Sequence, residues 1–420
     1  MDPTCSTGNP SASHVADETE LYEETELDQS CCTSYLALQV AKETELHIAT
    51  EQNHVERMKE LIDRDRSLLN TRDRDGKTSL HVACEMDNTE AVECLLNYPD
   101  CLVDIADNCE KYALHYAAEN GNVDNMKLLL NREAKVSEIL NKLDVNGETA
   151  LYLACKYGRT EAVELLLSHP RCLVNVGSEK LPLHCAAGNG YVEILKLLLE
   201  WDSTLLNKQD KDGETALHLA CAVGNDEIVY SLLNFEGLDL NLTDKWGNTC
   251  FHTAALSKVC DILSALLSQK PDLQNKINKK GRTALHIAAS IRNDTVIKYL
   301  LNLENCDVNV QDINGDTPLH LYVNAYKRTH FDIQNTDINV FKQKCSSLVD
   351  KGNKDGDTPL HKAVMVADHE SVNKLIEMSA NKDMKNNNGQ TPVDLAYNLV
   401  DSFEKIPILS YFKIATNGDI

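Results

Sequence analysis

Histidine is a common metal ligand and general acid or base, so the 14 histidines are the first residues to consider for chemistry. Nine of them recur at one place in a repeated motif: His47, His81, His115, His184, His218, His252, His286, His320 and His361. If the repeats stack, equivalent residues lie about 8–10 Å apart. Each nitrogen ligand of a zinc ion must lie within about 2.1 Å of the metal. The row therefore cannot share metals, and Tyr152 stands at the same place in one repeat. We expect a structural role for these histidines and no metal site.

The 15 cysteines show no spacing typical of a metal or redox site, since no Cys-x-x-Cys occurs. The first residues lack the basic start and apolar run of a secretory signal, so we expect reduced thiols. Cys84, Cys155 and Cys221 recur at one repeat position, where a small buried residue is expected. Phosphate-binding glycine loops and the His-Glu-x-x-His and Gly-x-Ser-x-Gly motifs are also absent. The sequence predicts no catalytic residue, no cofactor and no enzyme activity.

Charge and hydropathy narrow the function further. The formal net charge of the 420 residues is −24, which disfavours binding to nucleic acid or anionic lipid. The sequence contains no run of about 18 apolar residues, the length that is needed to cross a membrane. Residues 1–40 contain eight acids and no Lys or Arg, and we expect them to form an acidic disordered tail. A cytoplasmic, monomeric protein is the expectation, and whether Cys31 and Cys32 carry lipid stays open.

A motif of the form Gly-x-Thr-x-Leu-His repeats along the chain. Clear copies begin at Gly76, Gly213, Gly281, Gly315 and Gly356, and weaker copies fill the gaps between them. Eleven markers follow one another at steps of 32 to 41 residues, of which six are 34. A period of this length indicates stacked structural repeats in place of compact globular domains.

Each part of the motif has a physical role at a helix end. The recurring threonine is a good helix N-cap, because its hydroxyl accepts a hydrogen bond from the first turn. The five clear copies pair Thr78 with His81, Thr215 with His218, Thr283 with His286, Thr317 with His320 and Thr358 with His361. Pro318, Pro359 and Pro392 follow the cap, where proline is tolerated. A second helix with apolar residues at i, i+3 and i+4, such as Val92 and Leu95, completes each repeat.

With its period and its Thr-Pro-Leu-His motif, the sequence resembles the ankyrin-repeat family. The resemblance covers residues 41–400 and implies an all-α solenoid of about eleven helix-loop-helix units with β-hairpin-like loops. It also implies that the histidines hydrogen-bond the loops together. In that family the hairpin tips and first helices line a concave face that binds other proteins.

Two regions depart from the regular repeat. The unit at 315–355 is about seven residues longer than its neighbours. The extra residues could form a loop on the binding face, an extended first helix or a kink between two sub-stacks. Residues 401–420 carry apolar residues at helical spacing, and we expect them to form a C-terminal cap.

Candidate partner-binding residues are those that stand at hairpin tips or first-helix ends and are unusual for their repeat position. They are Trp246, Lys245, Tyr157, Arg292, Tyr322 and Tyr326. A structural role, in which each packs on its own neighbours, is the alternative for every one of them.

The function expected from the sequence is that of a non-catalytic scaffold or adaptor for protein partners. The alternative is a sensor or gating region of an ankyrin-rich ion channel, because the array also resembles the cytoplasmic repeats of A-type transient receptor potential channels.

Overall fold

The computed structural model describes residues 44–132, 139–177, 180–325, 338–342, 348–399 and 405–412. The acidic segment 1–40, including Cys31 and Cys32, lies outside these ranges. The chain divides into two compact units, residues 1–205 and 206–420, and each is a stack of helix pairs. Apart from one isolated bridge between Thr243 and Thr249, regular structure in the described ranges is helical. The predicted all-α solenoid of helix-loop-helix repeats is confirmed.

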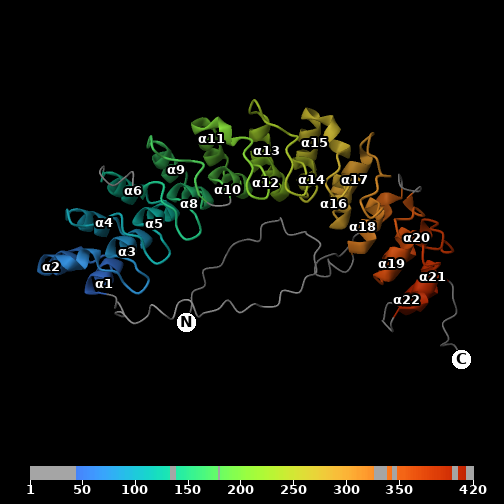
Figure 1. Cartoon of the computed structure of the whole chain (residues 1–420), viewed down its shortest axis with the longest axis horizontal. Helices are drawn as coiled ribbons and strands as arrows, with labels where there is room; N and C mark the ends of the chain where they lie inside the picture. The colour runs from blue at the N-terminus through green and yellow to red at the C-terminus, as the bar shows by residue number, and fades with distance from the viewer. Residues whose placement is uncertain are drawn as a thin grey trace. The chain divides into compact units, whose positions relative to one another are not determined.

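In the first unit, five first helices form one row and five second helices form another (Figure 1). The first helices are α1 (Glu45–Glu51), α3 (Ser79–Glu85), α5 (Ala113–Asn120), α8 (Ala150–Lys156) and α10 (Pro182–Asn189). The second helices are α2 (Val55–Arg64), α4 (Thr89–Leu96), α6 (Val123–Leu130), α9 (Thr160–Leu167) and α11 (Val192–Trp201). The 3₁₀ turns η2 (Arg66–Asn70) and η3 (Ser203–Leu205) follow α2 and α11.

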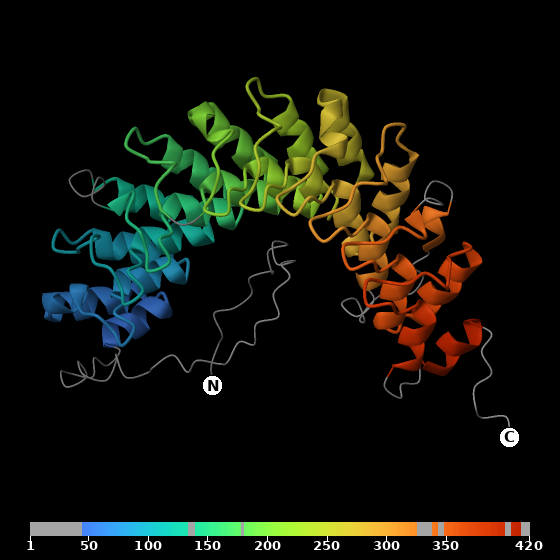
Figure 2. The same cartoon turned by 45° about the vertical axis from the view of Figure 1, so that its right-hand side comes forward.

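The second unit repeats this arrangement, and Figure 2 shows its two rows from another side. The first helices are α12 (Ala216–Val223), α14 (Cys250–Ala254), α16 (Ala284–Ser290), α18 (Pro318–Asn324), α19 (Pro359–Met365) and α21 (Pro392–Tyr397). Their partners are α13 (Asp226–Leu233), α15 (Cys260–Gln269), α17 (Asp294–Asn302), the 3₁₀ helix η6 (Ile338–Phe341), α20 (His369–Glu377) and α22 (Lys405–Tyr411). A further 3₁₀ turn, η4 (Pro271–Asn275), follows α15.

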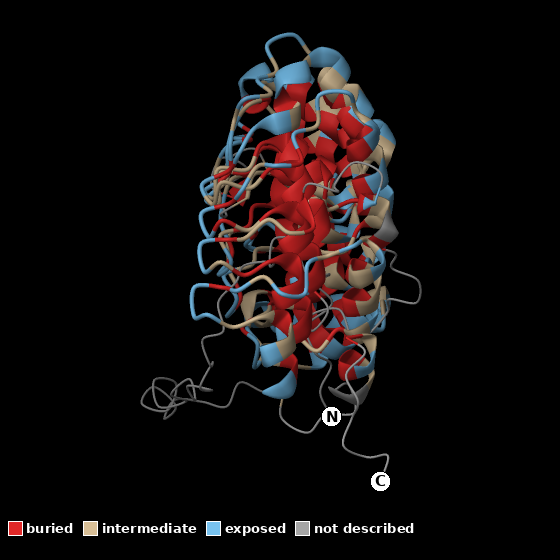
Figure 3. Cartoon of the chain, turned by 90° about the vertical axis from the view of Figure 1, so that its right-hand side faces the viewer, coloured by how far each residue is buried: buried red, intermediate tan, exposed pale blue. Residues whose placement is uncertain are grey.

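The core of each unit lies where the two rows of helices face each other (Figure 3). Leu80 and Ala83 of α3 and Val92 and Leu95 of α4 are at most 1% exposed. One helix pair has too small an apolar face to fold alone, so each pair must pack on its neighbours. The repeated cysteine is part of this core, since Cys84 is fully buried and its burial raises the pKa of the thiol. It packs as a small apolar residue, as predicted.

The long unit has a first helix of ordinary length. This helix, α18, has seven residues, as its neighbours α16 and α19 do, so of the three alternatives for the extra residues an extended first helix is wrong. The short η6 stands in the second row, where it contacts α17 and α20. Residues 326–337 and 343–347 of the long unit lie outside the described ranges.

Where the repeated histidine is present, it ties the start of its first helix to the following hairpin. In the third repeat of the second unit, the backbone N–H of Thr283 donates to His286 Nδ1 at 3.1 Å. Nδ1 is therefore unprotonated, and the proton on Nε2 is donated to the carbonyl oxygen of Asp316 at 3.3 Å. The same pair of contacts occurs at His81, His218, His320 and His361. Because both ring nitrogens are occupied by backbone groups, the imidazole is held neutral.

Burial keeps these histidines neutral well below the usual pH of protonation. It lowers the pKa of His81, His252 and His286 from 6.5 to about 4. Between these two values the unfolded chain takes up protons that the folded chain does not. The stability that these neutral histidines contribute is therefore fully present above about pH 6.5. It is lost as the pH decreases towards about 4. Each such histidine contributes on the order of 3 kcal/mol to this loss.

We predict that the urea midpoint of unfolding falls steeply between about pH 7 and about pH 4.5. Circular dichroism in urea at a series of pH values measures this dependence. The variant His286→Gln should be less stable at pH 7, but its stability should depend less on pH because one linked proton is removed. A midpoint that stays constant over this range would contradict the role of the neutral histidines.

Candidate interaction surface

The hairpin loops of each unit are held by two sets of backbone contacts. At the tip that contains Trp246, Asp244 Oδ1 accepts hydrogen bonds from the backbone N–H groups of Trp246 at 2.9 Å and Asn248 at 2.7 Å. The same turn is built on Asp73, Asp107, Asp144, Asp210, Asn278, Asp312, Asn353 and Asn386. The aspartate or asparagine thus fixes the turn, and the next residue stands at its tip.

Adjacent tips are also bonded to each other. The backbone N–H of Lys245 donates to Asp212 O at 2.7 Å, and that of Lys279 donates to Trp246 O at 3.0 Å. Equivalent bonds continue through Ile313, Lys354 and Asn387 in the second unit and join three tips in the first. A Cβ at Gly213 would lie 2.9 Å from the Lys245 nitrogen, so the close approach of neighbouring tips requires glycine there. The tips of each unit therefore form a fixed row.

Trp246 and Lys245 lie at a hairpin tip, where the sequence places them. Trp246 is half-buried, and the Lys245 ammonium lies 4.4 Å from the centre of its ring. Lys245 Nζ also lies 2.7 Å from Asp212 Oδ1 on the preceding tip. The indole and the lysine together form an exposed cation–π pair on the hairpin row.

Tyr157 follows α8 at the end of a first helix, and its side chain is 41% exposed. Lys156 Nζ lies 5.8 Å from the centre of the Tyr157 ring and 2.8 Å from Glu148 Oε1. Partial burial, followed by the negative charge of Glu119, raises the pKa of the Tyr157 phenol, so the hydroxyl stays neutral. Tyr157 therefore presents an aromatic face and a hydrogen-bonding hydroxyl beside paired charges.

Arg292 and Tyr322 are buried, and this burial removes them from the candidate surface. The Arg292 side chain is 6% exposed, and Tyr322 is 1% exposed. Arg292 stacks 4.9 Å from the centre of the Tyr322 ring and donates from Nε to Tyr322 O at 3.0 Å. The Tyr322 hydroxyl donates to Asp294 Oδ1 at 3.1 Å. Tyr326 lies outside the described residues.

Arg292 spans the long repeat. Its Nη2 lies 2.6 Å from Oδ2 of Asp368, which is 76 residues away and caps α20. Between the two residues in sequence stands the repeat whose described second-row element is η6. The ion pair joins the end of α16 to the start of α20, two repeats along the chain. Sequence reasoning missed Asp368, because no local pattern marks a contact over such a separation.

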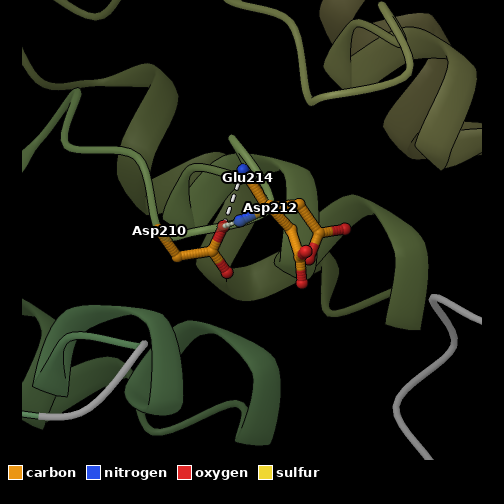
Figure 4. A group of neighbouring side chains, drawn as sticks. All are labelled: Asp210, Asp212 and Glu214. Carbon is orange, nitrogen blue, oxygen red and sulfur yellow. Dashed lines mark hydrogen bonds between the residues drawn. The ribbon is translucent and has the colours of Figure 1, made fainter.

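One group of carboxylates has a spacing compatible with a metal ion. Oxygens of Asp210, Asp212 and Glu214 lie within 4.8 Å of one another at a hairpin (Figure 4). Asp210 Oδ1 accepts from the backbone N–H groups of Asp212 and Glu214, and Asp212 pairs with Lys245. These contacts are those of the recurring turn and its neighbour. The group is explained by the hairpin fold and gives no reason to assign a metal.

Known proteins resemble this chain through its repeats. A family model described as ankyrin repeats (3 copies) matches residues 24–107, 46–139, 114–206, 183–277 and 251–332, and a single ankyrin-repeat model matches 355–387. Among solved structures, the ankyrin-repeat domain of Bcl-3 aligns at 25% identity with a TM-score of 0.48. That alignment covers 54% of this chain and 99% of the other.

Three curated relatives each match over 85 to 88 residues. The palmitoyltransferase ZDHHC13 of Mus musculus is 38% identical over 88 residues, which are 21% of this chain and 13% of that protein. An ankyrin repeat-containing protein of Arabidopsis thaliana is 33% identical over 85 residues, 20% of this chain and 16% of its own. The neurogenic locus Notch protein of Drosophila melanogaster is 33% identical over 87 residues, 20% of this chain and 3% of its own. The shared segments are a small part of each relative, so their activities do not transfer to this chain.

None of the described helices is long and apolar enough to cross a membrane.

We predict that Arg292→Met destabilises the second unit by about 3 kcal/mol, because Asp368 is left buried without its counter-ion. Adding Asp368→Asn should recover at least half of this loss, because asparagine keeps the cap on Ser371 and removes the charge. Thermal unfolding measures the loss. Hydrogen exchange should locate it in α20, with α12 of the same unit as the internal control. Equal protection of α20 in the wild type and in Arg292→Met would contradict the clamp.

Proposed function

Because the chain belongs to the ankyrin-repeat family, we propose that it is a non-catalytic scaffold or adaptor that binds partner proteins through its first helices and hairpin tips. The main support for this proposal is the distribution of exposed large apolar side chains over the fold. Six lie on or directly after first helices: Ile48, Met86, Tyr157, Val223, Met365 and Tyr397. Four lie in the hairpins: Leu143, Val145, Ile277 and Ile313.

The second-helix surface is different. Of the remaining exposed large apolar residues, Leu102 and Leu173 lie in loops. Two belong to described second helices, namely Trp201 at the last position of α11 and Tyr230 within α13. Exposed apolar side chains that gather on one side of a fold are typical of interaction surfaces. The asymmetry therefore favours binding at the side formed by first helices and hairpins.

The chemistry of the repeats supports a non-catalytic role. A general base needs a nitrogen or oxygen that is accessible to substrate. The repeat histidines are buried, and backbone groups occupy both ring nitrogens in eight of them. The described cysteines are free thiols, which fits a reducing compartment, and we propose a cytoplasmic, monomeric protein without a cofactor. The net charge of −24 favours protein partners over nucleic acid. The channel alternative rests on resemblance alone.

Tyr157 and Tyr230 form a matched pair for testing the proposed side. They are 41% and 45% exposed, but one ends a first helix and the other lies on a second helix. We predict that Tyr157→Ala weakens capture of at least one specific partner by about tenfold, the loss expected when an aromatic anchor is removed from an interface. Tyr230→Ala should leave that capture unchanged.

The measurement is quantitative mass spectrometry of proteins captured from cells by the full chain and by each variant. Equal thermal unfolding of the two variants serves as the folding control. If Tyr230→Ala removes partners and Tyr157→Ala does not, the second-helix side is the binding side and the proposal is wrong.

A further inference from the structure

Three consecutive tips of the second unit carry lysine at the same position of the turn. Lys211, Lys245 and Lys279 each follow the aspartate or asparagine that fixes its turn, and all three side chains are exposed. We call these three residues the lysine ladder. Its spacing is regular, because backbone hydrogen bonds join the first tip to the second and the second to the third. In a chain with a net charge of −24, three exposed lysines at equivalent positions of successive turns are unexpected.

The surroundings of the ladder add to its positive charge. The segment 276–282 carries Lys276, Lys280 and Arg282 besides Lys279, and contains no acidic residue. Lys276 pairs with Asp272 at 3.5 Å and Arg282 pairs with the buried Asp312 of the following tip, so the excess positive charge rests on Lys279 and Lys280. The third tip is therefore locally basic on its outer side.

The acids of the other two tips offset this charge only in part. Asp210 and Asp244 each accept hydrogen bonds from backbone amides of their own turns. Asp212 pairs with Lys245, but its side chain is 17% exposed whereas that of Lys245 is 50% exposed. The outer surface of the three tips thus presents ammonium groups more than carboxylates, and an incoming anion meets the lysines first.

We propose that the lysine ladder binds an acidic peptide segment in the polyproline II conformation, with carboxylates at every third residue. Stacked helices lie about 8–10 Å apart, so equivalent tip residues are separated by about that distance. A polyproline II helix has three residues per turn and rises about 3.1 Å per residue, so every third side chain lies on one face, about 9 Å from the last. Asp or Glu at positions 1, 4 and 7 of a peptide matches three successive lysines.

Trp246 gives this site an apolar element and a reporter. Its ring stands on the middle tip, with the Lys245 ammonium 4.4 Å from the ring centre. A carboxylate that draws Lys245 outwards changes the charge next to the indole, and an uncharged side chain of the peptide can pack on the ring. The chain has two tryptophans, so Trp201→Phe leaves Trp246 as the single source of indole fluorescence.

The inference rests on the proposed function, since it names the chemistry of one class of partner. The peptide site and the proposed scaffold function can nevertheless be tested separately. The ladder belongs to the second unit and Tyr157 to the first, so a ladder that binds no acidic peptide would leave the partner loss in Tyr157→Ala intact.

The test titrates the full chain carrying Trp201→Phe with synthetic peptides and follows the fluorescence of Trp246. One peptide has glutamate at positions 1, 4 and 7 of a Gly/Ser background, and the other has the same composition with glutamate at positions 1, 2 and 3. We expect the first to bind at least about threefold more tightly, because only its carboxylates reach three tips at once. Equal affinities would overturn the proposed register.

Charge variants test the lysines themselves. The triple variant Lys211→Gln, Lys245→Gln, Lys279→Gln should bind the spaced peptide at least about tenfold more weakly, as expected for the loss of three exposed ion pairs. The matched control changes three second-helix lysines that lie on other surfaces, Lys59→Gln, Lys196→Gln and Lys374→Gln. It alters the net charge equally and should bind as the parent does. If both triple variants lose affinity to the same extent, the effect is one of net charge and the ladder is not a site.

A variant that binds the peptide more tightly gives an independent test, because a variant that fails to fold would not gain affinity. Ile313 stands at the ladder position of the next tip and is 53% exposed. Lys354 already holds this position on the tip after that, so Ile313→Lys should join it to the ladder and make a row of five lysines. It should strengthen binding of a peptide with glutamate at positions 1, 4, 7 and 10 by about twofold to fivefold. No gain would overturn the proposal. Tighter binding of a single-stranded oligothymidylate than of either peptide would also overturn it, in favour of a nucleic-acid site.

Discussion

The histidine near the start of nine of the eleven first helices is the contact on which the stacking of those repeats depends. It accepts from the threonine that caps its own helix and donates to a carbonyl of the next hairpin, as at Thr283, His286 and Asp316. One neutral ring therefore satisfies backbone groups of two repeats, which would otherwise be buried without partners. Because a charged ring could not accept at Nδ1, the same contact requires the histidines to remain neutral. The hydrogen bond thus sets both the register of the stack and its sensitivity to acid.

Features that depend on nearby residues could be predicted from the sequence. The threonine caps, the proline at the first helical position and the buried Cys84 all follow from spacing within one repeat, and the structure has each of them. The position of Trp246 at a hairpin tip follows in the same way, from the aspartate two residues before it. A repeat of about 34 residues makes such local inferences strong, since every copy tests the same rule.

Features that join distant repeats could not be predicted. Arg292 ends a first helix like many other residues, and nothing near it in the sequence indicates burial. Its ion pair with Asp368 joins two helices that lie two repeats apart in the sequence. The guanidinium also stacks on the ring of Tyr322, which is buried. The sequence predicts both residues as surface candidates from their places at helix ends, and contacts between distant repeats bury their side chains instead.

The hairpin tips show why the fold leaves room for specific recognition. The residue after the turn-fixing aspartate or asparagine contributes its backbone N–H to the neighbouring tip, and this bond does not depend on the side chain. Accordingly the position holds Asn108, Val145, Lys245, Ile313 and Asn387, with the same backbone contact in each case. Substitutions at this position change the charge and polarity of the outer surface while the stack beneath keeps its hydrogen bonds. Three successive lysines at a freely variable position therefore need an explanation outside the fold, and electrostatic recognition of a partner supplies one.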